Sequence, residues 1–318
     1  MKISSEKFTH VADTQWATPV TYALGKAQPV AGGHVTNLSP TPSAGSITEI
    51  YQAYMADKLD DDTCQDPDRM LYAWKNLAPV FEHLHPQDVD RAVCRAYHAK
   101  RQANGAKSST INKELRFLRA SFKFSLGHHG GAIFAFLQEP PSRDRWLTRD
   151  EANRLLDCCK TDHLKLFIQL CLATAARKGA VYELTTDNIS FDQEGGGVID
   201  LGVKPNGKKR ARVPMTKSCR KAIEAALQVN ETEFVVEYGG KPVKDVIKAF
   251  NRAVKRAGIE DLHIQDLRHT AAVWMIGDGV EMAKVSTYLG HTSIDITRNV
   301  YAKYEPGHLK DAAAALEI

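Results

Sequence analysis

Apolar residues recur three and four positions apart along most of the chain, which is the spacing of helices with one buried face. In the first half this spacing predicts helices over residues 47–59, 70–84, 86–104 and from 108 onward. In the last of these, Ile111, Leu115, Leu118 and Phe122 form one stripe. In the second half it predicts helices over residues 149–159, 163–176, 216–227 and 244–257. The helix from residue 149 is preceded by Thr148, which with Glu151 forms a capping box.

The alternation of apolar and polar residues changes to a period of two in only one region. Residues 197–204 and 211–215 alternate in this way on either side of the turn sequence PNGKKR. This pattern is typical of a β-hairpin. The fold class predicted from the pattern is therefore mainly α with a small β-sheet.

Residues 263–304 place several chemically active side chains on three short helical units, Asp266–Ile276, Val280–Leu289 and Ile294–Tyr301. Gly290 suits a left-handed helix end, and Ser293 suits the N-cap of the following unit. With these breaks, Arg268, His291 and Tyr301 can converge on one site.

Changes in composition predict three segments. Residues 1–45 are rich in Gly, Pro, Ser and Thr with little periodicity, which is typical of a flexible arm. Residues 46–140 predict a domain of about four helices. Residues 141–318 predict a second domain, and the double proline of LQEPPSRDRWLT indicates a stiff linker between the two.

Charge and cysteine content narrow the class of partner. The net charge of the 318-residue chain is only +4, but residues 204–221 carry eight basic side chains and no acidic one. Residues 91–123 carry nine basic side chains against the single Glu114. Two such regions predict a protein that binds a polyanion from two sides. The six cysteines show no zinc-binding spacing. No apolar run reaches the roughly 18 residues of a membrane span, and residues 1–16 contain no secretory h-region. We therefore expect a cytoplasmic protein.

The run D-L-R-H-T, followed by L-G-H and T-x-x-x-Y-A, resembles the C-terminal signature of the tyrosine recombinases, the phage integrase family. Ser108–Leu118 is similar to a helix of that family's SAM-like core-binding domain. The resemblance implies an N-terminal core-binding domain and a C-terminal mixed α/β catalytic domain. It implies a site-specific DNA recombinase that needs no metal or other cofactor.

The resemblance also implies roles for particular residues. Arg177 and Arg268 would bind the phosphate, and Tyr301 would attack it to give a 3′-phosphotyrosyl intermediate, with Tyr304 as the alternative nucleophile. His291 would stabilise the developing charge. Lys204, or alternatively Lys208, would protonate the leaving oxygen.

Two positions depart from the family pattern. Gln265 stands where the family has a histidine, and glutamine cannot take a proton near neutral pH; His263 or His269 would then have to help. Ala180 stands where an acidic residue usually supports the first arginine, and Glu183 is the nearby substitute. Both departures keep open the alternative of a DNA-binding protein with an impaired active site.

Double-stranded DNA is the expected partner, bound by a homo-tetramer at synapsis, with accessory DNA-bending proteins as a further partner class. The activity expected is that of the integrase of a phage or mobile element, with a resolvase of chromosome or plasmid multimers as the rival. The predicted C-terminal helix after Pro306 would dock on a neighbouring protomer. The DNA-binding candidates are Arg95, Lys100, Arg101, Lys107, Lys113, Arg116, Lys208, Lys209 and Arg210.

Overall fold

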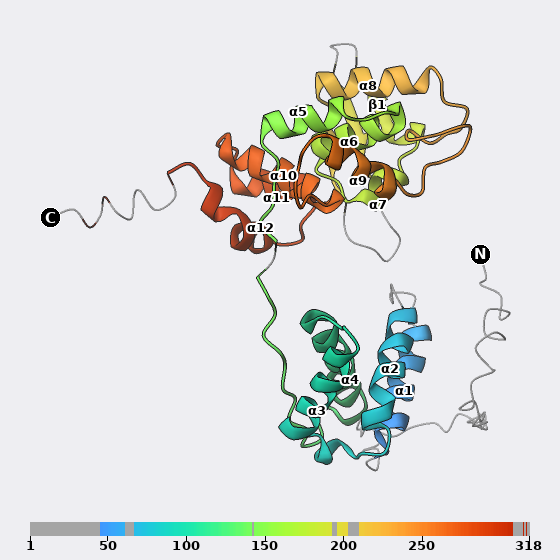
Figure 1. The fold of residues 1–318 in the computed structure, drawn as a ribbon, viewed down its shortest axis with the longest axis vertical. Coiled ribbons are helices and arrows are strands. Elements are labelled where there is room, and N and C mark those ends of the chain that lie inside the picture. Colours follow the sequence, from blue (N-terminus) through green and yellow to red (C-terminus); the bar gives the residue numbers. More distant parts are fainter. Residues whose placement is uncertain are drawn as a thin grey trace, which may run out of the picture. The chain divides into compact units, whose positions relative to one another are not determined.

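The computed structural model of the chain describes residues 45–60, 67–141, 143–192, 196–202 and 210–307, together with Ala314 and Leu316. Residues 1–44 of the predicted arm, the two hairpin lysines Lys204 and Lys208, and most of the predicted C-terminal helix lie outside the described residues. Within these ranges the fold is mainly helical with one small sheet, as predicted (Figure 1).

Four helices form the N-terminal part: α1 (Ile47–Asp60), α2 (Pro67–Phe81), α3 (Arg91–Ala103) and α4 (Ser108–Leu126). They surround one hydrophobic core, in which the predicted stripe of α4 is fully buried. The ring of Tyr51 in α1 stacks on Trp74 in α2, with 4.7 Å between ring centroids. The apolar spacing therefore identified the buried face of α4 correctly.

The beginning of α3 differs from the prediction of a helix from residue 86. Pro86–Asp88 forms only a 3₁₀ turn, and the α-helix begins at Arg91. The reason is Asp90, whose carboxylate accepts hydrogen bonds from the backbone N–H groups of Ala92 and Val93 at 2.7 and 2.8 Å. These bonds satisfy two donors of the first turn, so Asp90 is the true N-cap.

The C-terminal part contains the longer series of elements (Figure 1). Its helices are α5 (Arg149–Asp157), α6 (Asp162–Thr174), α7 (Lys178–Tyr182), α8 (Lys217–Leu227), α9 (Ile247–Arg256), α10 (Ile264–Gly277), α11 (Met282–Leu289) and α12 (Ile294–Tyr301), with 3₁₀ turns at Thr186–Asn188 and at Ala302–Tyr304, the latter called η4. The Thr148–Glu151 capping box is present, with reciprocal bonds of 2.8 and 3.1 Å.

The sheet is antiparallel in the order β1 (Ile189–Phe191), β2 (Gly197–Asp200) and β3 (Arg212–Pro214). The predicted hairpin corresponds to β2 and β3, whereas β1 was not predicted. Ile199 pairs with Ile189 on one side and Val213 on the other. Ile199 and Val213 are buried, so one face of this small sheet joins the hydrophobic core.

The segment between the two parts binds a different partner at each end. Leu137 donates its backbone N–H to Asn112 of α4, and its carbonyl accepts from the same side chain, both at 2.8 Å. At the other end, the Leu147 N–H donates to Thr270 of α10, and the Leu147 carbonyl accepts from the indole of Trp274.

Candidate active site

Arg268 lies on the buried face of α10 and is 7% exposed. Its guanidinium donates to the carbonyls of Ala175 and Leu289, both at 2.7 Å, and to Nε2 of His291 at 3.0 Å. Ala175 and Leu289 stand at the C-terminal ends of α6 and α11, where helix carbonyls lack intrahelical donors. The ends of two helices therefore hold this arginine in place.

His291 follows the left-handed Gly290 that ends α11, as predicted. Arginine can only donate, so Nε2 of His291 must accept from Arg268. The proton of the neutral ring is then on Nδ1, which lies 2.8 Å from the Thr297 hydroxyl. Burial, together with the charges of Arg268 and Arg177, lowers the pKa of His291 to about 4. His291 is consequently neutral at physiological pH.

Arg177 is the N-cap of α7 and is partly buried. It lines a pocket of about 270 Å³ together with Arg268, Arg210, Glu183 and Ala180. Burial and the charge of Arg210 lower the pKa of Arg177, and no described residue accepts a hydrogen bond from its side chain. Two predicted phosphate ligands, Arg177 and Arg268, thus share one small cavity.

Glu183 does not support Arg177, contrary to the interpretation from sequence. Its carboxylate accepts from Arg210 at 2.6 Å. Ala180, at the position where the resemblance leads us to expect an acid, is buried and offers no acceptor side chain. Arg177 is therefore left without an acidic partner among the described residues.

Tyr301 is the last residue of α12 and is 6% exposed. Its ring packs on His269, with 5.1 Å between centroids, and lies 6.5 Å from the ring of Tyr304. Burial raises the pKa of Tyr301, and the nearby charge of Arg268 opposes that rise. The structure therefore places this phenol within the electrostatic reach of Arg268, inside one chain.

Tyr304 is differently placed. Its hydroxyl donates to Asp144, which also accepts from Lys303 and lies 3.4 Å from Nε2 of His269. Asp144 follows the linker prolines, and no sequence motif singled it out. Because the Tyr304 hydroxyl is already bonded, the geometry favours Tyr301 over Tyr304 as the reactive phenol.

Gln265 and His263 lie near the beginning of α10 and are exposed. No described residue bonds the Gln265 side chain, and it does not line the pocket of Arg177 and Arg268. His269 is the histidine that packs on Tyr301, whereas His263 serves as the N-cap residue of α10.

A model described as the phage integrase family matches residues 145–308, which is slightly more than half of the chain. The chain belongs to this family. It is a tyrosine recombinase, a site-specific DNA recombinase that cuts and rejoins DNA strands. Within the described residues, no helix is long and apolar enough to cross a membrane.

Relatives of this recombinase include proteins named XerC and proteins named integrase. It is 27% identical to tyrosine recombinase XerC of Staphylococcus epidermidis over 236 residues, 68% of this chain and 78% of the relative. It is 28% identical to the integrase of Salmonella phage P22 over 194 residues, 57% of this chain and 49% of that protein. Its fold is similar to that of the Tn1549 transposon integrase in complex with transposon right end DNA, with a TM-score of 0.69, 16% identity and coverage of 86% and 99% of the two chains.

Seven of the nine predicted DNA-binding residues of the recombinase fall into three groups. Arg95, Lys100, Lys107 and Lys113 are exposed on α3, the N-cap of α4 and α4 itself. Arg116 is half-exposed but bonds Glu139 at 2.8 Å. Lys208 and Lys209 lie outside the described residues, as does the general-acid candidate Lys204.

Arg101 does not present a free charge, and its prediction as a phosphate contact needs correction. Its side chain is 13% exposed and forms a two-bond ion pair with the buried Glu114 at 2.8 and 3.0 Å. Glu114 also accepts from Tyr97 at 2.6 Å and from Asn76 at 3.1 Å. This network joins α2, α3 and α4, which is a structural role.

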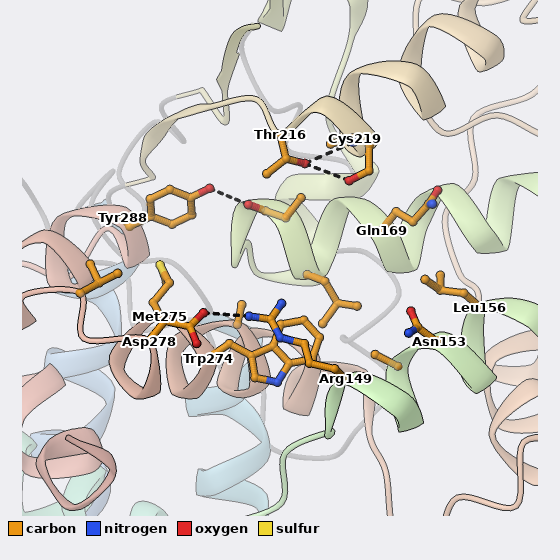
Figure 2. A pocket seen from close by; sticks show the side chains of 16 residues that line it. Arg149, Asn153, Leu156, Gln169, Thr216, Cys219, Trp274, Met275, Asp278 and Tyr288 are labelled. Carbon is orange, nitrogen blue, oxygen red and sulfur yellow. Dashed lines mark hydrogen bonds and ion pairs between the residues drawn. The ribbon is translucent and has the colours of Figure 1, made fainter. Parts of the chain in front are cut away.

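A larger cavity of about 650 Å³ lies between α5, α6, α8, α10 and α11 and is separate from the arginine pocket (Figure 2). The Arg149 guanidinium stacks 3.8 Å from the ring centroid of Trp274 and pairs with Asp278 at 3.0 Å. On the other side, the Tyr288 hydroxyl donates to the carbonyl of Ala173 at 2.6 Å. This mostly apolar lining gathers no group of acids, bases or nucleophiles, so the arginine pocket is the candidate for chemistry.

Proposed function

We propose that Tyr301 is the nucleophile and that Arg177 and Arg268 bind the scissile phosphate. The observation that carries this proposal is the position of Arg268, which bonds His291 at 3.0 Å and lines one pocket with Arg177, and whose charge opposes the rise that burial causes in the pKa of Tyr301. Planar guanidinium groups donate paired hydrogen bonds that match the nonbridging oxygens of a phosphodiester. A buried site makes such bonds stronger than they are in water.

In the proposed step, the Tyr301 phenol gives up its proton to solvent, its oxygen forms a bond to phosphorus, and the bond from phosphorus to the 5′ oxygen breaks. The DNA is left with a 3′-phosphotyrosyl link and a free 5′ end, whose oxygen takes a proton to become a hydroxyl. Attack of a 5′-hydroxyl on the phosphotyrosine reverses the step and releases Tyr301. The energy of the phosphodiester is conserved in this exchange.

Lys204 is the proposed donor of that proton, and Lys208 is the alternative. A lysine loses its proton more readily than an arginine when it lies in a basic or partly desolvated setting. Residues 204–221 supply such a setting in the sequence.

His291 is proposed to donate to the phosphate in the transition state. In the free protein its Nε2 accepts from Arg268, so this role requires the proton to move to Nε2. Thr297 permits the change, because its hydroxyl can accept from Nδ1–H or donate to a bare Nδ1. The Arg268 donor that bonded Nε2 is then free for the phosphate.

The proposed roles can be tested without knowing the target site. A pool of nicked duplexes with random flanking sequence is incubated with the protein, and DNA that stays attached under denaturing conditions is sequenced. Wild type should give a covalent adduct that converges on one sequence, and Tyr301→Phe should give none. Tyr304→Phe is the matched control and should still give the adduct.

The outcomes separate the alternatives clearly. An adduct formed by Tyr301→Phe but not by Tyr304→Phe would transfer the nucleophile role to Tyr304. If wild type shifted DNA on a native gel and yet gave no adduct under any condition, catalysis by this site would be refuted. Gln265, in the usual histidine position, would then be the first residue to examine.

We further propose that the protein is the integrase of a phage or mobile element and acts as a tetramer on two DNA sites. The P22 and Tn1549 relatives are named as integrases, whereas the XerC relatives support the rival role in resolving multimers. Once the site is known, plasmids with two identical sites test resolution, and plasmids with two different sites test integration. Removal of the residues after Pro306 should abolish synapsis if the tail docks on a neighbouring protomer.

A further inference from the structure

Arg210 stands at the edge of the arginine pocket, two residues before β3. Its guanidinium donates to the carboxylate of Glu183 at 2.6 Å and to the carbonyl of Leu201 at 3.2 Å. The Arg210 side chain is 13% exposed, whereas that of Glu183 is 52% exposed. Arg210 is therefore held in the pocket by a partner that lies on its solvent side.

Three guanidinium groups and one carboxylate line this pocket of about 270 Å³. The positive charge of Arg210 contributes to lowering the pKa of Arg177. Gathering like charges in a partly buried place is unfavourable unless an opposite charge enters it. The excess of positive charge next to Arg177 and Arg268 thus favours an anion at this point.

Arg210 also keeps donors available. A guanidinium has five N–H groups, and among the described residues Arg210 uses one on each terminal nitrogen. One N–H on each terminal nitrogen and the Nε–H thus have no acceptor among the described residues. Because arginine stays protonated at any physiological pH, these groups can bind an oxygen but cannot act as an acid.

The local sequence explains why Glu183 holds Arg210 and not Arg177. Position 180 is an alanine, so α7 offers no carboxylate beside Arg177. The next acid along the chain is Glu183, at the end of α7, and it reaches the residue entering β3 instead. The acidic support in this chain therefore fixes a third arginine.

We propose that Arg210 donates hydrogen bonds to a nonbridging oxygen of the scissile phosphate, as a third guanidinium beside Arg177 and Arg268, and that Glu183 is its positioning residue. This inference rests on the proposed function of the same pocket. Arg210, which the sequence predicted only as a DNA-binding residue, is thereby assigned to the reacting phosphate.

The test compares two substrates that differ at one atom. One is the nicked duplex identified with the random pool, and the other carries a methylphosphonate at the scissile position, separated into its two diastereomers. A methylphosphonate has a neutral methyl group in place of one charged oxygen. The variants are Arg210→Ala and Arg210→Lys, and Arg154→Ala is the control, because Arg154 is exposed on α5 and lies outside the two basic regions.

On the phosphodiester, Arg210→Ala should slow formation of the covalent adduct by about 10²- to 10³-fold, the usual cost of losing one donor to a developing oxyanion. On the methylphosphonate diastereomer that lacks the contacted oxygen, the same substitution should slow the reaction by less than about 10-fold. Arg210→Lys should fall between wild type and Arg210→Ala, and Arg154→Ala should match wild type on both substrates.

Equal slowing of Arg210→Ala on the phosphodiester and on both methylphosphonates would overturn the proposal, because a purely structural role does not depend on the substrate oxygen. A wild-type protein that gives no adduct on any substrate would instead refute the function of the whole site. Thermal unfolding of each variant shows whether it is folded, and Arg210→Lys keeps the inference testable if the alanine variant is not.

Glu183 is tested by a double-mutant cycle. Glu183→Ala should slow adduct formation less than Arg210→Ala, because it frees the guanidinium without removing it. The double variant should be no slower than Arg210→Ala alone, since a positioning residue has no effect once its partner is gone. Additive losses would show that Glu183 acts independently of Arg210.

Discussion

The ion pair between Arg101 and Glu114 gives a prediction that separates structural from DNA-binding arginines. Glu114 accepts four hydrogen bonds, two from Arg101 and one each from Tyr97 and Asn76. The two paired side chains are only 13% and 7% exposed. Removal of either charge leaves the other buried without a counter-charge, which typically costs about 3–5 kcal/mol. Glu114→Ala and Arg101→Ala should each reduce the free energy of unfolding by this amount.

Equilibrium urea unfolding measures the loss, and hydrogen exchange in α2, α3 and α4 localises it. Replacing both residues by methionine should recover most of the stability, because a well-packed apolar pair avoids the desolvation of two charges. DNA binding supplies the second measurement. Each phosphate contact contributes about 0.9 to the slope of log affinity against log salt concentration.

At a temperature where the variants are folded, Arg101→Ala should keep the wild-type slope. Arg95→Ala, on the exposed side of α3, should reduce it by about one if Arg95 binds a phosphate. An Arg101→Ala variant with unchanged stability and a reduced slope would refute the structural assignment.

Three further predictions concern the active site. Folding lowers the pKa of His291 from 6.5 to about 4, so the unfolded chain binds the proton first as the pH falls. The free energy of unfolding should therefore decrease as the pH falls from 6.5 to 4. Urea unfolding at pH 7 and 5 should show a smaller decrease in His291→Gln than in wild type. Asp144→Asn weakens the bonds to Lys303 and Tyr304, and hydrogen exchange in η4 should become faster while that in α5 stays the same. Gln265→His introduces a group that can take a proton, and adduct formation above pH 6.5 should become faster by up to about 10²-fold. An unchanged pH profile would show that the residue at position 265 does not accept the proton of the nucleophile.

Local patterns predicted the features that depend on neighbouring residues. The buried stripe of α4, the capping box at Thr148 and the left-handed end at Gly290 each involve positions within a few residues of one another. The failures also have local causes. Asp90 displaced the predicted start of α3 through its capping bonds, and β1, which was not predicted, has no fully buried position.

The motif spacing predicted that Arg268, His291 and Tyr301 converge, but it could not give their partners. The carbonyl that holds Arg268 at Ala175 is 93 residues away in sequence, and the pairing of Arg101 with Glu114 joins two different helices. Glu183 was considered for Arg177 because they are close in sequence, whereas the fold brings Arg210 to it from the strand side. Charges on separate elements are paired by the tertiary structure, which sequence spacing does not show.

In the proposed mechanism, the charges and hydrogen bonds of these residues keep the site inactive in the free protein. Burial and the charge of Arg177 lower the pKa of Arg268 to about 10, so its charged form is less stable here than in water. Arg177 has no acidic partner among the described residues, Glu183 is bonded to Arg210, and His291 is neutral. In the proposed mechanism, a bound phosphodiester supplies negative charge to Arg177 and Arg268. The same event draws Arg268 away from Nε2 of His291 and lets that nitrogen donate, so that on this proposal the site is complete only with DNA bound.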